Sequence, residues 1–314
     1  MGLAFVFPGQ GSQAVGMGTE LAEAFAAARE VFEEVDDALG QKLFRLMRDG
    51  PIEELTLTEN AQPALMAVSM AVVRALEGEL GVPMSKAAFV AGHSLGEYSA
   101  LAAAQAITLG DTARLLRLRG QAMQRAVPVG EGAMASLIGP KTDVALAEAA
   151  AAVGAEIGVC VVANDNNAGN VVISGDKAAV DRAIEAAKAL GARAIPLNVS
   201  APFHCPLMQP AADEMAEALA AAGVVAPRAP LVANITARPV LDPDVIRRLL
   251  VEQITGRVRW RESIEWLAGE GGVTRFAEAG AGKVLTGMAK RIAPDADSVA
   301  LNTPADLEAF AKSL

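Results

Sequence analysis

A serine flanked by small residues is the feature of this sequence with the clearest chemical potential. Ser94 lies in Gly92-His93-Ser94-Leu95-Gly96, after an apolar segment and before an Ala-rich segment typical of a helix. This is the G-x-S-x-G pattern of a nucleophile elbow, in which a strained turn exposes a serine hydroxyl above a sheet. The start of the helix also favours negative charge that develops beside the serine. The pattern predicts a catalytic serine, and an ordinary glycine-rich strand-to-helix turn is the alternative.

The choice of a base for this serine is narrow, because the chain has two histidines. The side chain of His93 should diverge from that of its neighbour Ser94 at a tight turn, which leaves His204 as the base. The order serine then histidine is that of α/β-hydrolase-like enzymes. Since no acidic residue closely precedes His204, we expect a carbonyl to orient the imidazole. A structural histidine in a proline-rich loop is the alternative.

Two further segments carry polar groups that could serve such a site. Residues 8–13, Pro-Gly-Gln-Gly-Ser-Gln, form a glycine-rich loop whose N–H groups could approach a ligand, or a plain tight turn. This loop lacks the Gly-Lys-Ser/Thr of a phosphate-binding loop. Arg119 stands beside Gly120, so its guanidinium could reach inward, or it could decorate a solvated helix face. The loop of residues 164–167 could supply amide donors, or simply form a turn.

Composition narrows the class of protein. The 314 residues are 52% hydrophobic and carry a net charge of −10, which supports a large core and argues against nucleic acid or an anionic membrane as ligand. Two cysteines without ligand-like spacing suggest neither a disulfide framework nor, with two histidines, a zinc site. The N-terminus lacks a basic signal region, and no apolar run could span a membrane. We therefore expect a soluble, cytoplasmic, metal-free protein.

The pattern of apolar residues predicts elements that would position these groups. A buried strand over residues 3–7 and a strand before Ser94 indicate an α/β body. Helices are predicted at 20–38, 61–78, 111–124, 208–222, 243–254 and 260–269, and a strand near 229–236. From residue 132 the order is β-α-β-β-α-β, which is typical of ferredoxin-like modules. We predict an α/β body of residues 1–127 and 200–314, with an inserted subdomain at 128–199.

Together these motifs resemble one family. Residues 7–13 (Phe-Pro-Gly-Gln-Gly-Ser-Gln), residues 92–97 (Gly-His-Ser-Leu-Gly-Glu), Arg119 in Leu-Arg-Gly-Gln and the pair Phe203-His204 resemble malonyl-CoA:acyl carrier protein transacylases. The resemblance covers the whole chain, including Gly-Ala-Gly-Lys-Val-Leu at 280–285. It implies a hydrolase-like parallel-sheet body with an inserted ferredoxin-like subdomain. It also implies an enzyme without cofactor that moves malonyl units from malonyl-CoA to acyl carrier protein.

The resemblance further implies a role for each matching residue. Ser94 would carry the acyl group as an ester, and His204 would move the proton. The backbone N–H groups of Gln10 and Leu95 would form the oxyanion hole. Arg119 would pair with the malonyl carboxylate. The remaining assignments are Gln253, whose carbonyl would orient the histidine, Asn166, which would line the site, and Phe203, which would crowd an α-methyl branch.

The resemblance leaves other functions open. A serine thioesterase would use the same elbow but ignore the distal carboxylate, and a non-catalytic acyl-binding module would need no Ser94–His204 pair. An acyltransferase of a polyketide or malonate-decarboxylase system would share nearly the same chemistry. We expect holo acyl carrier protein as partner of a monomer. Because carrier proteins are acidic, docking needs a basic patch, for which the candidates are Arg257, Arg259, Arg261, Lys283, Lys290 and Arg291.

Overall fold

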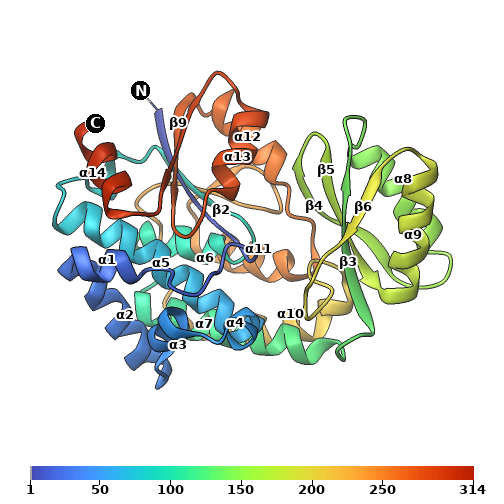
Figure 1. Cartoon of the computed structure of the whole chain (residues 1–314), viewed down its shortest axis with the longest axis horizontal. Helices are drawn as coiled ribbons and strands as arrows, with labels where there is room; N and C mark the ends of the chain where they lie inside the picture. Colours follow the sequence, from blue (N-terminus) through green and yellow to red (C-terminus); the bar gives the residue numbers. More distant parts are fainter. Residues whose placement is uncertain (1) are drawn as a thin grey trace.

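The computed structural model describes residues 2–314 and contains two separate sheets (Figure 1). The larger sheet has the strand order β10-β9-β1-β2-β7-β8. Its strands are β1 (Gly2–Phe7), β2 (Phe89–Gly92), β7 (Leu231–Val232), β8 (Pro239–Val240), β9 (Val273–Ala279) and β10 (Asp297–Leu301). All neighbouring strands are parallel except β7 and β8, which are antiparallel. The predicted parallel-sheet body is therefore confirmed.

Helices cover both faces of this sheet, as a parallel sheet of continuous apolar strands requires. On β1, Leu3, Phe5 and Phe7 pack into the core beneath α5 and its neighbours, whereas Ala4 and Val6 pack into the core beneath α12 and α13 (Figure 1). The helices are α1 (Thr19–Ala24), α2 (Ala26–Leu39), α3 (Leu43–Asp49), α4 (Ile52–Thr56), α5 (Thr58–Gly78), α6 (Gly96–Ala103), α7 (Leu109–Ala126), α10 (Gln209–Ala221), α11 (Pro243–Thr255), α12 (Trp260–Ala268), α13 (Val284–Ile292) and α14 (Pro304–Lys312). Short 3₁₀ turns lie at η1 (Met84–Lys86) and η2 (Pro206–Met208).

The smaller sheet is antiparallel and has the order β4-β5-β3-β6. It consists of β3 (Gly132–Ile138), β4 (Cys160–Asn167), β5 (Asn170–Asp176) and β6 (Arg193–Pro196), with helices α8 (Val144–Gly154) and α9 (Lys177–Ala189). These elements have their own apolar core, rich in alanine. The β-α-β-β-α-β order is the one the sequence predicts. All of them fall within residues 128–199, and the boundaries of that subdomain stay a prediction.

Two segments differ from the sequence-based expectation. Residues 164–167 do not form a loop, because β4 continues through Asn167 with two irregularities in its register. Backbone groups of this segment form hydrogen bonds with Val258, which lies outside the small sheet. Asp165 N–H donates to Val258 O, and Val258 N–H donates to Ala163 O. The strand predicted near 229–236 is only Leu231–Val232, after which the chain turns at Asn234. Both differences reflect tertiary pairing that a local pattern does not contain.

Within residues 2–314, no helix combines the length and the apolar character needed to cross a bilayer.

Candidate active site

Ser94 lies in the turn between β2 and α6, and its backbone is strained. Its φ is 52°, in the left-handed region that side chains rarely adopt. The turn is tight enough to exclude any side chain at the flanking glycines. A Cβ on Gly92 would lie 1.9 Å from Gly96 O, and one on Gly96 would lie 2.2 Å from Phe7 O. The two glycines of the motif are therefore required by the close packing of the elbow.

Asn234 holds this strained turn in place. The backbone N–H of Ser94 donates to Asn234 Oδ1 at 2.8 Å, and Asn234 Nδ2 donates to Gly92 O at 2.7 Å. Asn234 is fully buried just beyond β7, the parallel neighbour of β2. Local sequence patterns do not identify this residue. Its only sequence signal is an asparagine soon after a short apolar run, which many turns share.

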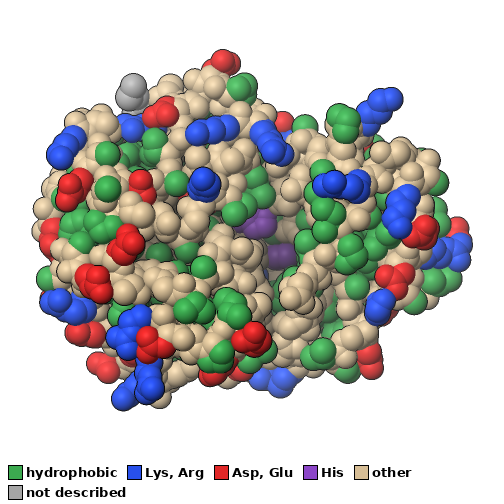
Figure 2. Space-filling view, viewed as in Figure 1, with side chains coloured by type: hydrophobic (Ala, Val, Ile, Leu, Met, Phe, Trp, Pro, Cys, Tyr) green, Lys and Arg blue, Asp and Glu red, His purple; other side chains and the backbone are tan. Residues whose placement is uncertain are grey.

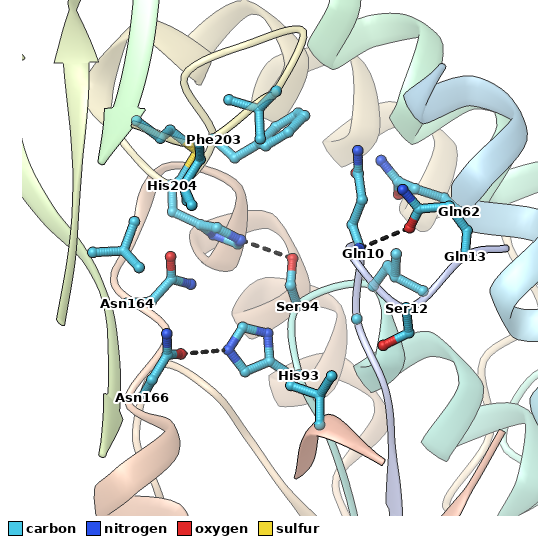
Figure 3. Close-up of a pocket in the computed structure, with 18 of the residues that line it drawn as sticks. Gln10, Ser12, Gln13, Gln62, His93, Ser94, Asn164, Asn166, Phe203 and His204 are labelled. Carbon is cyan, nitrogen blue, oxygen red and sulfur yellow. Dashed lines mark hydrogen bonds between the residues drawn. The ribbon is translucent and has the colours of Figure 1, made fainter. Parts of the chain in front are cut away.

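His204 lies at hydrogen-bond distance from the serine. Its Nε2 is 2.7 Å from Ser94 Oγ (Figure 3). Its Nδ1 is 2.8 Å from the main-chain oxygen of Gln253. Because a carbonyl only accepts, the proton sits on Nδ1, and Nε2 is left to accept the serine proton. Burial first, and then the positive charge of Arg119, lowers the pKa of His204 to about 3. The imidazole is therefore neutral near neutral pH and able to act as a base.

Arg119 points inward from α7 and does not decorate a solvated face. Its side chain is fully enclosed, with the residue 2% exposed. One guanidinium nitrogen donates to Gln62 Oε1 at 2.7 Å, and the other donates to Gln253 Oε1 at 2.8 Å and to Ser94 Oγ at 3.3 Å. Gly120 allows α7 this approach, because a Cβ there would meet Glu59 Cα at 2.5 Å. Among the described residues no carboxylate forms a salt bridge with Arg119, so its charge faces the serine without a direct counter-ion.

Gln253 contacts both the base and the arginine. Its main-chain oxygen accepts from His204, and its side-chain oxygen accepts from Arg119. Its side-chain nitrogen donates to Ser94 O at 2.9 Å and to Glu97 Oε2 at 2.6 Å. Burial raises the pKa of Glu97 to about 7. The sequence predicts no role for Glu97 or for Gln62, since a glutamate in the first turn of a helix and a glutamine within a helix are common and carry no local signal.

The loop that contains Gln10 packs directly against the elbow. A Cβ on Gly9 would lie 2.7 Å from His93 O, and Thr58 Oγ1 donates to Gln10 Oε1 at 3.0 Å. The backbone N–H groups of Gln10 and Leu95 donate to no other group among residues 2–314. Both residues line the same cavity as Ser94. Two N–H groups are thus available near the serine for an incoming oxygen.

The small subdomain supplies a further wall of the site. Asn166 Oδ1 lies 2.9 Å from Nε2 of His93, whose side chain diverges from that of Ser94 as expected (Figure 3). Burial lowers the pKa of His93, which is consistent with a neutral imidazole that donates to this amide oxygen. Asn164 and Phe203 line the same cavity. Asn166 and Phe203, which the sequence offers as site residues, therefore both line this cavity, and Asn166 does so from strand β4 rather than from a loop.

These residues enclose a cavity of about 370 Å³ between the two sheets. The body contributes Ser94, Arg119 and His204 together with Leu285 and Met288 of α13, and the smaller sheet contributes Met134 and Val172. Figure 2 shows the entrance as a hollow between the two parts, with histidine at its bottom. This volume lies within the ordinary range for small-molecule sites. Within residues 2–314, no group of three or more His, Cys, Asp or Glu side chains is placed to hold a metal ion.

An elbow serine, a neutral histidine and two free N–H groups in one buried cavity define an enzyme of the serine acyltransferase or hydrolase class. Comparison with known proteins makes the class specific. Residues 4–300 match the family model described as "Acyl transferase domain". The malonyl CoA-acyl carrier protein transacylase of Escherichia coli (strain K12) is 46% identical over 98% of this chain and 97% of its own length. The chain therefore belongs to the family of malonyl CoA-acyl carrier protein transacylases.

Solved structures support the same assignment. The acyl-carrier-protein-S-malonyltransferase from Bartonella henselae is 56% identical and aligns with a TM-score of 0.96 over 100% of this chain and 99% of that one. A malonyl-transacylase in complex with its type II polyketide acyl-carrier protein is 42% identical, with a TM-score of 0.96 over 100% of both chains.

Proposed function

We propose that this enzyme transfers the malonyl group from malonyl-CoA to the phosphopantetheine thiol of acyl carrier protein, through a malonyl ester on Ser94. The observation that carries this function is the buried guanidinium of Arg119, 3.3 Å from the oxygen of an activated serine. A site with that geometry is suited to a short acyl group that ends in a carboxylate.

The first half-reaction forms the ester. Ser94 Oγ attacks the thioester carbon of malonyl-CoA while His204 Nε2 accepts the hydroxyl proton, so a C–O bond forms and the carbonyl oxygen gains negative charge. The N–H groups of Gln10 and Leu95 donate to this oxygen; one such donor is typically worth about 10²–10³ in rate. The C–S bond then breaks, and His204 returns the proton to the leaving CoA sulfur.

The second half-reaction reverses these roles. The phosphopantetheine thiol of the carrier protein gives its proton to His204 and attacks the ester carbon of malonyl-Ser94. The C–O bond breaks, and His204 returns the proton to Ser94 Oγ. CoA leaves before the carrier arm enters, so the kinetics are of the ping-pong type.

Arg119 selects the acyl group in this proposal. The malonyl carboxylate pairs with the guanidinium, whereas an uncharged acyl group leaves that buried charge unpaired, at a cost of about 3–5 kcal/mol. A thioesterase has no use for this charge, which disfavours that alternative. Polyketide-type and malonate-decarboxylase-type transferases share the same chemistry, and they remain alternatives for the pathway. Phe203 and Leu95 narrow the cavity against an α-methyl branch, and Asn166 lines the acyl site.

Intact-protein mass spectrometry after mixing with malonyl-CoA tests this function. The enzyme should gain the mass of one malonyl group, and holo carrier protein should remove it. The Ser94→Ala variant should gain none, because it lacks the nucleophile. Removal of the adduct by water as fast as by carrier protein would instead indicate a thioesterase.

We propose further that the carrier protein docks beside α13. Three of the six candidate basic residues are already ion-paired. Arg257 pairs with Glu148 and Arg259 pairs with Glu262. Arg261 pairs with both Asp165 and Glu265. Lys283, Lys290 and Arg291 form no salt bridge among the described residues. They lie at or within α13, whose Val284, Leu285 and Met288 line the cavity. Their charge is therefore available to an acidic partner that docks beside α13.

Reversal of the charge on α13 should weaken the docking of carrier protein without weakening the binding of malonyl-CoA. In the variant Lys290→Glu/Arg291→Glu, KM for carrier protein should rise about 5- to 10-fold, because rim charges mainly steer association. KM for malonyl-CoA should stay within about 2-fold. Steady-state kinetics with each substrate varied measures both values. The control variant Arg29→Glu/Arg45→Glu reverses two exposed arginines on α2 and α3, and an equal rise in that control would contradict the docking site.

We also propose that the enzyme works as a cytoplasmic monomer without a cofactor. The two cysteines, Cys160 and Cys205, are free and buried, which suits a reducing compartment.

A further inference from the structure

Glu97 is a buried acid at the site that the chemistry above does not use. It is 1% exposed and lies in the first turn of α6, three residues after Ser94. Its Oε2 accepts from Gln253 Nε2 at 2.6 Å and from Asn234 N at 3.4 Å. Burying a carboxyl group costs free energy unless hydrogen bonds replace those it made to water. Among residues 2–314, the one side chain that hydrogen-bonds to Glu97 is that of Gln253, which contacts both the base and the arginine.

The side-chain amide of Gln253 can make all of its hydrogen bonds in only one orientation. Arg119 only donates, so Gln253 must face it with Oε1. The nitrogen then points to Ser94 O and to Glu97 Oε2, and each of these accepts one N–H. An amide rotated by 180° would bring N–H groups against the guanidinium and its oxygen against two acceptors. Glu97 therefore favours the orientation in which Gln253 accepts from Arg119.

We propose that Glu97 is a positioning residue for malonyl selectivity, which fixes the Gln253 amide and through it the guanidinium of Arg119. This inference rests on the proposed function. Gln253 and Gln62 hold Arg119 from its two terminal nitrogens, so the position of each amide sets where the guanidinium points. Loss of one holder frees the arginine to rotate away from the acyl group. Glu97 touches neither substrate nor base, and the side chain it binds holds Arg119, so its main effect should fall on the charged acyl group.

Two variants at position 97 separate the hydrogen bond from bulk packing. Glu97→Met keeps the size and removes the acceptor, whereas Glu97→Gln retains an acceptor oxygen. With Glu97→Met, kcat/KM for malonyl-CoA should fall about 10-fold relative to that for acetyl-CoA, the size expected when one charge-assisted hydrogen bond is lost. With Glu97→Gln, the malonyl-to-acetyl ratio should stay within about 3-fold of the unaltered enzyme, by the same reasoning.

A double-mutant cycle tests whether the effect passes through the amide. Gln253→Leu removes the side-chain amide but keeps the main-chain oxygen that binds His204. In that background, Glu97→Met should leave the malonyl-to-acetyl ratio unchanged. Glu278→Met is a matched control, because Glu278 is equally buried and its partners are Leu285 and Thr286, at the start of α13. That control should lower the melting temperature without a change in the ratio.

Three results would overturn the proposal: equal loss for both acyl substrates in Glu97→Met, no loss in that variant, or a loss in Glu97→Gln as large as in Glu97→Met. An additive cycle would also overturn it. Melting temperatures identify variants that fail to fold, and in that case the milder Glu97→Gln and the Gln253→Leu background decide the outcome. A malonyl adduct on Ser94 of the unaltered enzyme shows independently whether the proposed function holds, so the two failures are distinguishable.

Discussion

The His204→Ala variant should lose about 10⁶-fold in kcat, the size of loss found when the histidine base of a serine nucleophile is removed. Nε2 of His204 is the acceptor 2.7 Å from Ser94 Oγ, and without it the hydroxyl keeps its proton at neutral pH. Stopped-flow release of CoA thiol measures the first half-reaction directly. Carrier-protein malonylation, followed separately, should fall by a similar factor, because the same imidazole activates the second thiol.

The control is the second histidine. His93→Asn removes an imidazole from the same elbow, but that ring faces Asn166 rather than the serine hydroxyl. It should cost far less than His204→Ala. Comparable losses in the two variants would show that His204 is not the base.

The Arg119→Ala variant should reverse the preference for acyl groups. Loss of the partner of a buried carboxylate costs about 3–5 kcal/mol, so kcat/KM for malonyl-CoA should fall about 10²- to 10³-fold. Acetyl transfer should be spared or rise, because the buried charge that an uncharged acyl group leaves unpaired is gone. Steady-state kinetics with malonyl-CoA and with acetyl-CoA give the ratio of the two kcat/KM values, which tests this prediction.

Arg119→Lys provides a graded test of the same contact. A lysine keeps the charge but cannot form the paired contact of a guanidinium with a carboxylate. Its malonyl rate should lie between those of the unaltered enzyme and Arg119→Ala. Equal losses for malonyl and acetyl groups in either variant would refute a carboxylate-binding role.

Much of this site could be predicted from the sequence because its chemistry sits in local patterns. The elbow is set by sterics at Gly92 and Gly96, which leave a signature within five residues. The scarcity of histidine made His204 the only candidate base. The β-α-β-β-α-β order was readable because α9 has a marked helical period, α8 is rich in alanine, and two apolar segments lie between these helices.

The rest of the site depends on contacts between distant parts of the chain. Asn234 and Gln62 serve the site only because β7 lies beside β2 and α5 lies beside α7. No local pattern distinguishes them from ordinary polar residues in a turn or a helix. The polar run at 164–167 looks like a loop by composition, and it is a strand because Val258 supplies the missing hydrogen bonds. Local sequence patterns contain no information about pairing across long sequence separations.

The main-chain oxygen that orients His204 has a consequence for how the enzyme tolerates mutation. In a serine–histidine–aspartate triad, one codon change deletes the orienting group. Here that group is the carbonyl of Gln253 in the last turn of α11, where carbonyls lack partners within the helix and the helix dipole is negative. Every amino acid carries a backbone carbonyl, so no replacement at position 253 removes it. Single substitutions at position 253 therefore leave the orienting group in place, and it is lost only when the end of α11 changes its conformation.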